Sequence, residues 1–327
     1  MTKDETKKSE ADYDVIVIGG GPAGLTAVLY ASRGGLKTLM LEKATPGGLA
    51  QTTDIIENYP GFPEGISGPE LMESMEKQAR KFGAEFKNIN EVVAIEKSNE
   101  TIFSVKTSDN TITSKSVIIA TGAESRKIGV PGESKYIGRG VSYCAVCDGA
   151  FFKDAEVAVV GGGNSAVEEA LFLTKFVKKI YLIHRRDRLR ADNVIVERAK
   201  NNQKIEFVWD TVVEEVIGDV KGVSSLKLKN IKTEQVQELP VEGVFVYIGY
   251  KPNTVFLEGL LELDKGGFVV TDGEMNTNVS GIMACGDVRS KALKQIVTAT
   301  GEGATAAFSS EKYIDKLENR EYGDFKK

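Results

Sequence analysis

Two stretches of one design decide the fold: VIVIGGGPAGLTAVLYASR at residues 15–33 and VAVVGGGNSAVEEALFL at residues 157–173. Each begins with four apolar residues, continues through three glycines and ends in the apolar spacing of a helix. Each is followed by a second short apolar run, near 37–41 and at 179–183. Strand, glycine turn, helix and strand form the βαβ unit of a doubly wound sheet. Two copies predict an α/β protein with two Rossmann-like dinucleotide-binding domains.

The remaining apolar runs place the second domain inside the first. Residues 116–124 and 243–254 both form strands that exit into a glycine turn, and the strands after residue 250 have no glycine-rich turn of their own. The chain is therefore expected to leave the first domain near 122 and to return near 250. This predicts a flexible tail at 1–12, a discontinuous first domain at 13–122 and 250–327, and an inserted second domain at 123–249. A helix is expected from about Leu293 to Leu317.

Length, charge and cysteine content exclude several classes of protein. The chain has 327 residues, which suggests two domains at roughly 150 residues each. Its 42 basic and 47 acidic side chains give a net charge of −5 and no broad basic surface for nucleic acid. No run approaches the roughly 20 apolar residues that span a membrane, and residues 1–12 lack the apolar segment of a signal peptide. We expect neither nucleic acid nor a membrane as partner, and a reducing, cytoplasmic location.

The first glycine turn has the spacing Gly19-x-Gly21-x-x-Gly24, after a strand and before a helix. Such a turn lets the backbone approach a pyrophosphate, and the free N–H groups of the helix bind its charge. An ordinary strand–helix turn is the alternative. Glu42, 18 residues after Gly24, favours the nucleotide site, because a carboxylate there accepts hydrogen bonds from ribose hydroxyls and repels a 2′-phosphate. The first site is therefore predicted to take FAD or NAD.

The second turn, Gly161-x-Gly163-x-x-Ala166, has a different residue at the position that distinguishes a ribose hydroxyl from a 2′-phosphate. The position equivalent to Glu42 is His184, which opens the cationic run HRRDRLR at 184–190. Guanidinium groups bind phosphates bidentately, so the run favours NADP(H), although a solvated basic edge is the alternative. His184 by itself is equally consistent with a core or surface histidine. Because hydride passes readily from nicotinamide to flavin, an NADP(H) site favours FAD in the first domain.

The pair Cys144-Ala145-Val146-Cys147 lies 14 residues before the second turn. A structural zinc site needs about four ligands, which two cysteines and one distant histidine do not supply. The spacing instead favours a redox-active dithiol. The next residue, Asp148, is a candidate proton donor and acceptor, with turn chemistry as its alternative role. The third cysteine, Cys285, is interpreted as a small core residue.

The position of the pair predicts a domain motion. The cysteines belong to the nicotinamide domain, and one flavin face cannot meet both the nicotinamide and the disulfide of the same rigid body. We expect the two domains to rotate about the strand exits near 122 and 250.

The chain resembles the low-molecular-weight thioredoxin reductases of bacteria and archaea from about residue 13 to residue 315. The segments that carry the resemblance are VIGGGPAGL, IENYPGFPEGISGPEL, YCAVCDGAFF, VVGGGNSAVEEA, IHRRDRLRA, FVYIGYKPNT and GIMACGDV. The resemblance implies a homodimeric FAD protein in which NADPH reduces the flavin, the flavin reduces the disulfide and the dithiol reduces thioredoxin.

The resemblance also implies roles for single residues. Cys147 would face the flavin, Cys144 would attack the disulfide of thioredoxin, and Asp148 would be the acid–base group. Asp287 would hold the ribityl–phosphate part of FAD, and residues 294–296 would lie along the isoalloxazine.

Two departures from the family pattern concern flavin contacts. Leu49 follows the Gly47-Gly48 pair where many relatives have glutamine, which appears here only at Gln51. Lys294 stands where many relatives have arginine. The intact cation run argues against relatives that take electrons from ferredoxin.

The predicted sites can be stated residue by residue, with no metal site among them. The predicted catalytic residues are Cys144, Cys147 and Asp148. The predicted FAD contacts are Gly19, Gly21, Pro22, Ala23, Gly24, Glu42, Gly48, Gln51, Asn58, Thr121, Gly122, Gly286, Asp287, Lys294, Gln295 and Ile296. The predicted NADPH contacts are Gly161, Gly163, Asn164, Ser165, Ala166, His184, Arg185, Arg186 and Arg190.

Three alternatives stay open at the level of sequence. The same chemistry would serve a glutaredoxin-like protein or a peroxiredoxin-reducing module, because docking surfaces carry no short motif. A flavin-dependent ferredoxin–NADP reductase shares the architecture but would not need Cys144 and Cys147. A non-catalytic redox sensor would leave the chain of redox groups without a use.

Overall fold

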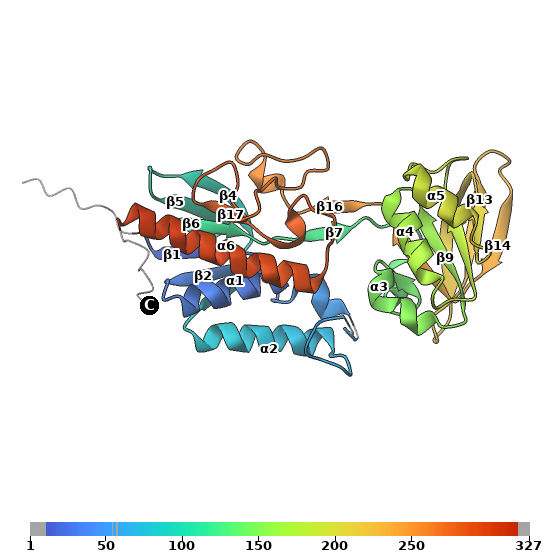
Figure 1. Ribbon diagram of the computed structural model, residues 1–327, viewed down its shortest axis with the longest axis horizontal. Helices are drawn as coiled ribbons and strands as arrows, with labels where there is room; N and C mark the ends of the chain where they lie inside the picture. Colours follow the sequence, from blue (N-terminus) through green and yellow to red (C-terminus); the bar gives the residue numbers. More distant parts are fainter. Residues whose placement is uncertain (1–10, 54, 57, 320–327) are drawn as a thin grey trace, which may run out of the picture.

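The computed structural model describes residues 11–319, except residues 54 and 57, and consists of two lobes joined by two strands (Figure 1). The first lobe contains strands β1–β6 and β17 with helices α1, α2 and α6, and the second contains strands β8–β15 with helices α3–α5. Residues 1–10 of the predicted tail and residues 320–327 of the predicted first domain lie outside the described residues. Asp12, the last residue of that tail, is held by Thr113, whose backbone N–H and hydroxyl both donate to its carboxylate.

A seven-stranded sheet forms the centre of the first lobe. Its parallel strands run in the order β3-β2-β1-β6, the arrangement of a dinucleotide-binding half. The long strand β6 has two further partners, antiparallel β5 along its first half and parallel β17 along its second half, and β4 follows β5 at the edge. The strands are β1 (Tyr13–Ile18), β2 (Thr38–Glu42), β3 (Glu85–Asn88), β4 (Val92–Lys97), β5 (Phe103–Thr107), β6 (Thr111–Ile119) and β17 (Ile282–Ala284).

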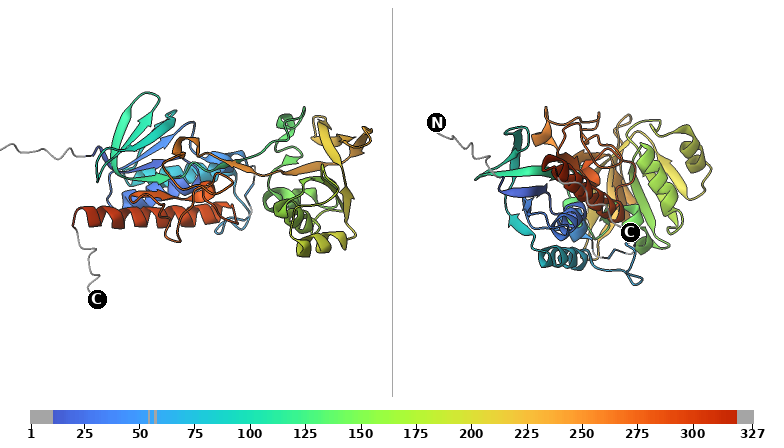
Figure 2. Two further views of the ribbon diagram at one scale, coloured as in Figure 1. Left: turned by 90° about the horizontal axis from the view of Figure 1, so that it is seen from above. Right: turned by 60° about the vertical axis from the view of Figure 1, so that its left-hand side comes forward.

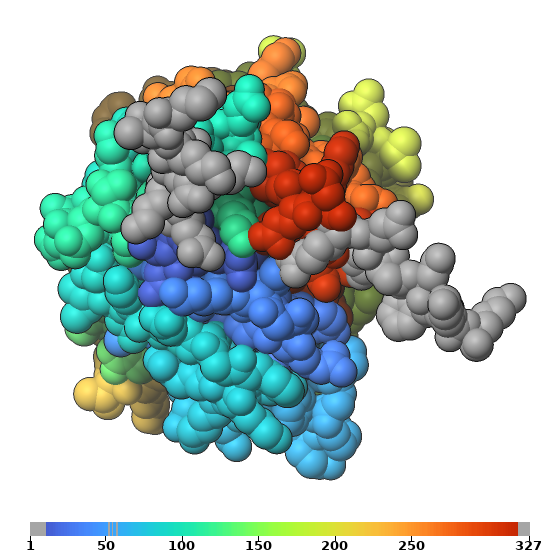
Figure 3. All heavy atoms as spheres, turned by 90° about the vertical axis from the view of Figure 1, so that its left-hand side faces the viewer, coloured from blue at the N-terminus to red at the C-terminus, as the bar shows by residue number. Residues whose placement is uncertain are grey.

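Three helices pack together in the first lobe: α1 (Pro22–Arg33), α2 (Gly68–Lys81) and α6 (Ile296–Leu317). Figure 3 views this lobe from its far end, where α1 and α2 (blue and cyan) and the end of α6 (red) form one surface. Helix α1 is buried along most of its length, and each fully buried Val or Leu in it contributes about 1.5–3 kcal/mol to stability. Helix α6 approaches α1 closely at Gly303, where a Cβ would lie 2.2 Å from the carbonyl oxygen of Ala23.

The second lobe is built on a five-stranded parallel sheet in the order β11-β10-β9-β15-β8. Alternate residues of its central strands face two different cores: Val157 and Val159 pack against α4 and α5, whereas Ala158 and Val160 pack against a small antiparallel sheet. The parallel strands are β8 (Val141–Ser142), β9 (Glu156–Gly161), β10 (Lys179–Ile183), β11 (Ile205–Val208) and β15 (Gly243–Tyr247). The helices are α3 (Ala145–Asp148), α4 (Asn164–Leu173) and α5 (Asn193–Lys200).

The small antiparallel sheet consists of β12 (Thr211–Gly218), β13 (Val223–Asn230) and β14 (Val236–Pro240). No such sheet was predicted from the sequence. An irregularity between Val213 and Glu215 breaks the alternation of inward and outward side chains in β12, so its period of two is hidden in the sequence. The tip of the β13–β14 hairpin reaches the loop that follows β11, where the backbone N–H of Ile231 donates to the carbonyl of Asp210.

Two short strands connect the lobes, β7 (Ala123–Ser125) and β16 (Tyr250–Pro252), paired antiparallel (Figures 1 and 2). Thr121 and Asn253 fix this crossing, because the hydroxyl of Thr121 donates to the carbonyl of Asn253 and the amide of Asn253 donates back at 2.9 Å. A two-stranded crossing with few other contacts is the geometry of a hinge.

The α/β fold class with two glycine-turn units is confirmed by the parallel strands at the centre of the two large sheets. The expected helix at 293–317 begins later than predicted, at Ile296. Its start is set by a reciprocal cap, in which the side chain of Gln295 accepts from the backbone of Thr298 and the hydroxyl of Thr298 accepts from the backbone of Gln295.

Candidate functional site: two glycine turns and a disulfide

The first glycine turn connects β1 to α1 and needs glycine for steric reasons. Gly19 has a φ of +106°, and a Cβ at Gly24 would lie 1.8 Å from the carbonyl oxygen of Gly19. The helix can therefore start directly against the strand. The cap residue Gly21 offers no side chain, and Pro22 and the buried Ala23 begin the helix. The N–H groups of the first turn of α1 are thus directed at a ligand position, which fits a dinucleotide phosphate.

Glu42 ends β2 beside this turn, as its spacing predicted. Its carboxylate accepts from the backbone N–H of Gly20 at 2.6 Å and from that of Ala44 at 2.9 Å. The two bonds fix the carboxylate at the turn, and each oxygen keeps a lone pair for a ribose hydroxyl.

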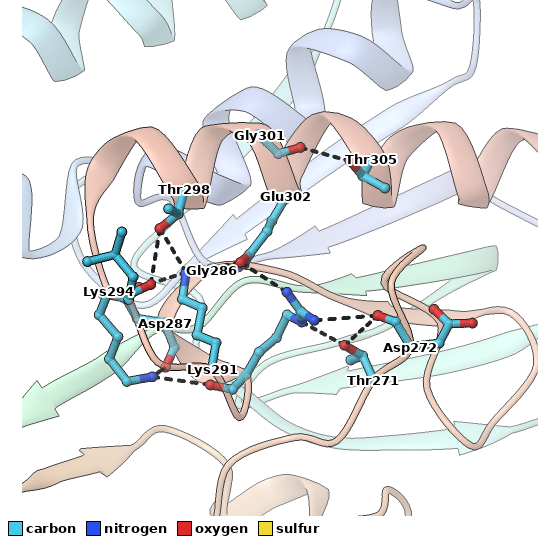
Figure 4. A network of polar contacts seen from close by, with 12 residues as sticks. Thr271, Asp272, Gly286, Asp287, Lys291, Lys294, Thr298, Gly301, Glu302 and Thr305 are labelled. Carbon is cyan, nitrogen blue, oxygen red and sulfur yellow. Dashed lines mark hydrogen bonds and ion pairs between the residues drawn. The ribbon is translucent and has the colours of Figure 1, made fainter. Parts of the chain in front are cut away.

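A network of charged residues surrounds Asp287, in the short helical turn that follows β17 (Figure 4). Glu302 of α6 accepts from the backbone N–H of Gly286 at 2.7 Å and pairs with Lys291 and Arg289 at 3.2 and 3.0 Å. Lys291 also pairs with Asp287, 3.2 Å from Oδ1. All three partners of Glu302 are nearly buried in this cluster, so the loop holding Asp287 is tied firmly to α6.

Oδ1 of Asp287 is a buried acceptor inside this cluster. It is paired with the ammonium of Lys291 at 3.2 Å, and within the described residues no hydrogen bond of good geometry reaches it. Burial raises the pKa of Asp287, and the neighbouring Lys291 and Lys294 partly offset this effect. A buried carboxylate oxygen that has an ion pair but no hydrogen bond fits the hydroxyl of a ribityl chain.

Lys294 and Gln295 use their side chains in different ways. The ammonium of Lys294 donates to the carbonyls of Asp287 and Arg289 and lies 4.1 Å from the ring centre of Phe268. Burial lowers the pKa of Lys294 to about 8. The side chain of Gln295, which caps α6, also accepts from Asn58 Nδ2 at 3.1 Å.

The other predicted flavin contacts lie outside the first glycine turn. Gly48 begins a short helical turn in which Gln51 folds back over Gly47. Leu49, in the same turn, is 54% exposed. Thr121 and Gly122 belong to the hinge, and Ile296 is the first residue of α6.

The second glycine turn, between β9 and α4, has Ala166 in its third position, where the first turn has Gly24. Gly161 approaches the backbone of Tyr247 and the Cβ of Ala166, whereas nothing lies within 4 Å of a Cβ at Gly163. A small cleft opens beside the turn and is lined by Gly163, Asn164, Ser165, Ala166 and Arg190 together with residues 246–250 near the hinge. Asn164 also braces the cleft, because its amide and the start of α5 at Asp192 exchange two hydrogen bonds.

The single histidine is not part of the exposed cation run that follows it. His184 is 6% exposed and packs beneath the turn, so that a Cβ at Gly162 would lie 2.3 Å from its ring. Burial lowers its pKa, with further lowering from Arg190, Arg186 and Arg185. The ring is therefore neutral near pH 7, and within the described part of the chain its buried Nε2 has no hydrogen-bond partner.

The arginines at 185, 186 and 190 are all exposed beside the second turn. Within the part of the chain that the structure describes, none of the three forms an ion pair. The backbone N–H of Arg190 donates to the carbonyl of Gly162 at 2.7 Å, which ties the loop to the glycine turn. Unengaged guanidinium groups at this position fit a 2′-phosphate.

The two cysteines form a disulfide at the start of α3, with their Cα atoms 5.3 Å apart. Cys144 caps the helix, and its sulfur accepts from the backbone N–H of Cys147 at 3.2 Å. Asp148 lies in the same turn and accepts from the hydroxyl of Ser142 at 2.6 Å. The carboxyl predicted to move protons therefore belongs to the residue next to Cys147, in the turn that Cys144 caps.

The disulfide of the second lobe contacts the first lobe at a predicted flavin residue. The side-chain amide of Gln295 lies 4.0 Å from the sulfur of Cys144. The structure thus brings together three groups from distant parts of the sequence: the loop at Asn58, the start of α6 and the redox helix. The predicted order of the cysteines, with Cys147 toward the flavin, stays a prediction.

Sequence reasoning missed three residues that support the redox helix. Tyr247 accepts from the backbone N–H of Ala145 at 2.5 Å. Glu133 is 1% exposed and accepts from the backbone N–H groups of Ile128 and Gly129 and, at 2.8 Å, from the hydroxyl of Tyr143. The segments YCAVCDGAFF and FVYIGYKPNT contain the two tyrosines, but only the tertiary fold joins Tyr247 to α3 and Tyr143 to Glu133.

The family model of the pyridine nucleotide-disulphide oxidoreductases matches residues 13–303. The chain belongs to this family. A thioredoxin reductase of Listeria innocua is 49% identical over 310 residues, which cover 94% of this chain and 96% of that protein. The predicted resemblance is thereby confirmed, and the chain is an oxidoreductase.

Solved structures in the family agree with this assignment. The thioredoxin reductase from Streptococcus pyogenes has a TM-score of 0.87 at 48% identity and covers 93% of this chain and 98% of its own. Lactococcus lactis thioredoxin reductase in the FR conformation has the same identity and covers 93% of this chain and 100% of its own, but its TM-score is 0.66. At equal identity and nearly equal coverage, the lower score indicates that the same parts are arranged differently.

Proposed function

We propose that this oxidoreductase transfers electrons from NADPH through FAD and the Cys144–Cys147 disulfide to thioredoxin. The observation that carries the proposal is the contact between the disulfide and Gln295, because it places the sulfur couple of the second lobe at the residues predicted to lie along the flavin. The family and the thioredoxin reductase relatives support the same route.

The first lobe is proposed to hold FAD. The N–H groups at the start of α1 would bind the pyrophosphate, Glu42 would accept from a ribose hydroxyl, and the buried Oδ1 of Asp287 would accept from the ribityl chain. Bound there, the flavin supplies the exchange between hydride transfer and dithiol chemistry.

The second lobe is proposed to hold NADPH at its glycine turn. The arginines at 185, 186 and 190 would bind the 2′-phosphate, and the cleft beside Gly163 would receive the pyrophosphate. In the present arrangement the disulfide, rather than this cleft, touches Gln295. We therefore propose that the lobes rotate about β7 and β16, and the differing TM-scores of the two related structures support such a motion.

The redox helix is proposed to perform the final exchange. The thiolate of Cys144 would attack the disulfide of thioredoxin and form a mixed disulfide, which the thiolate of Cys147 would then break to restore the Cys144–Cys147 bond. The leaving thiolates would take up protons, and Asp148 is placed to supply or accept them.

We also propose a homodimer in the cytoplasm. Exposed aromatic side chains on α1 and α6, Tyr30 at 49% and Phe308 at 42%, offer apolar surface for a second copy. A dithiol that must be regenerated suits a reducing compartment. Separately, none of the helices that the structure describes is long and apolar enough to cross a membrane.

The proposal is tested by following flavin absorbance. Adding NADPH is expected to bleach a yellow preparation, and oxidised thioredoxin is then expected to restore the colour. Cys144→Ser and Cys147→Ser should still bleach with NADPH but should not turn over thioredoxin. If a glutaredoxin or a peroxiredoxin-reducing module restores the colour and thioredoxin does not, the proposed partner is wrong. Equal turnover in the serine variants would exclude the dithiol route.

A further inference from the structure

A lysine at the tip of the β13–β14 hairpin, which nothing in the sequence marked, forms an ion pair with the cation run. Lys232, at the tip of the hairpin, lies 3.3 Å from the carboxylate of Asp187 and 3.0 Å from that of Asp210. Asp187 is the acidic residue within the run HRRDRLR, 45 residues away in sequence. The hairpin is therefore joined by charge to the loop proposed to bind the 2′-phosphate.

Backbone bonds make this contact a fixed part of the lobe. The N–H of Ile231 donates to the carbonyl of Asp210, and the N–H of Asp210 donates to the carbonyl of Arg186 at 3.3 Å. The amide of Asn230 also reaches the carbonyl of Trp209 at 3.5 Å. The hairpin tip, the loop after β11 and the cation run thus form one connected unit.

We infer that Lys232 is a specificity-determining residue for the 2′-phosphate of NADPH. It acts by neutralising Asp187 and Asp210, whose carboxylates would otherwise repel a phosphate held by Arg185 and Arg186. The inference rests on the proposed NADPH site and extends it to a residue outside the dinucleotide-binding fold. It concerns selectivity between NADPH and NADH, because NADH carries no 2′-phosphate.

The electrostatics support this role. The ion pair with Lys232 lowers the pKa of Asp187, and hydrogen bonds to Asp210 and Asp187 raise that of Lys232. Asp187 and Lys232 are 68% and 58% exposed, so the effect is moderate and screened by salt. Asp210 is only 16% exposed, and removal of Lys232 would leave this carboxylate without its ion pair, in the loop whose backbone is bonded to Arg186.

The test measures equilibrium binding of NADP⁺ and NAD⁺ to the flavin-loaded protein by calorimetry, with fluorescence of Trp209, the single tryptophan, as a second readout. Lys232→Ala should weaken NADP⁺ binding by about two- to five-fold and leave NAD⁺ binding unchanged. Lys232→Glu should weaken it further, and 1 M salt should reduce both effects. Lys229→Ala is the matched control, since Lys229 pairs with Glu234 on the same hairpin and should change neither affinity.

The same substitution in an Asp187→Asn protein separates the effect of charge pairing from a general loss of structure. In Asp187→Asn protein, the loss caused by Lys232→Ala should be smaller, because one of the two carboxylates has been removed. The inference is overturned if Lys232→Ala and Lys232→Glu bind NADP⁺ like the wild type, if they weaken NADP⁺ and NAD⁺ equally, or if Asp187→Asn leaves the full effect in place. Wild-type protein without a preference for NADP⁺ would overturn both this inference and the proposed cofactor, whereas normal preference with insensitive variants would overturn the inference alone.

Discussion

The two glycine turns allow a substitution that should remove one cofactor and leave the fold intact. Gly21→Ala adds a Cβ at a residue with φ −75° and ψ −175°, a conformation open to any residue. The nearest heavy atom to that Cβ is the Cα of Gly48 at 4.0 Å, an ordinary contact. The unfolding free energy of the protein without cofactor should therefore change by no more than about 0.5 kcal/mol.

The same Cβ would occupy the approach of the pyrophosphate to the backbone. Forcing one carbon into a close contact costs about 1–3 kcal/mol, which corresponds to a loss of FAD affinity of about 5- to 150-fold. Flavin content of the purified protein and fluorescence titration with FAD measure the loss, and thermal unfolding measures the stability. A folded Gly21→Ala protein that binds FAD like the wild type would refute the assignment of the first turn.

Two neighbouring substitutions sharpen the comparison. A Cβ at Gly24 would lie 1.8 Å from the backbone oxygen of Gly19, so Gly24→Ala should destabilise the first lobe itself by about 3 kcal/mol or more. Gly163→Ala, with open space around its Cβ, should lower NADP⁺ affinity while flavin content stays normal. Loss of flavin from Gly163→Ala, in place of NADP⁺ binding, would reverse the assignment of the two turns.

Three further predictions concern the second lobe and the third cysteine. Burial, with a smaller contribution from Glu168, raises the pKa of Glu169 from 4.5 to about 7, so the folded protein keeps a proton there that the unfolded chain releases, and stability should fall as pH rises between these values. Glu169→Gln should remove that fall in melting temperature measured against pH, and an unchanged profile would contradict the assignment. Tyr143→Phe should cost about 1.5–3 kcal/mol in urea unfolding, because its hydroxyl donates to the buried carboxylate of Glu133, whereas Tyr181→Phe, whose partner Glu156 is more exposed, should cost less. Cys285 is fully buried with its pKa raised to about 12, so iodoacetamide at pH 8 should label two thiols of the NADPH-reduced protein and three only after denaturation, as counted by mass spectrometry.

Much of the first lobe and of both turns could be predicted because the deciding interactions are local. A strand, a glycine turn and a helix lie within about 20 residues, and the absence of a side chain at Gly24 is visible in the sequence before any contact is known. Glu42 was found by spacing for the same reason, since a strand of known direction brings it back to the turn. The cysteine pair was found because its spacing alone sets the geometry of a small disulfide ring.

The contacts that organise the site around these motifs could not be predicted, because each joins residues far apart in the chain. Gln295 and Cys144 are 151 residues apart, and Tyr247 and Ala145 are 102 apart. His184 shows the limit most clearly: its place at the start of the cation run left a core or a surface position open, and only the fold shows that its ring lies buried beneath the turn. The small sheet β12–β14 was hidden by an irregular strand.

The α/β class, the two glycine turns and the cysteine pair could be derived from the residue order, because backbone sterics and residue spacing act between near neighbours in the chain. The side chains that support them could be identified only in the folded protein, because burial and charge pairing depend on the packing of the whole lobe. Glutamate is ordinarily a surface residue, so nothing in the sequence marks Glu133. Only the fold makes it a buried acceptor of three hydrogen bonds.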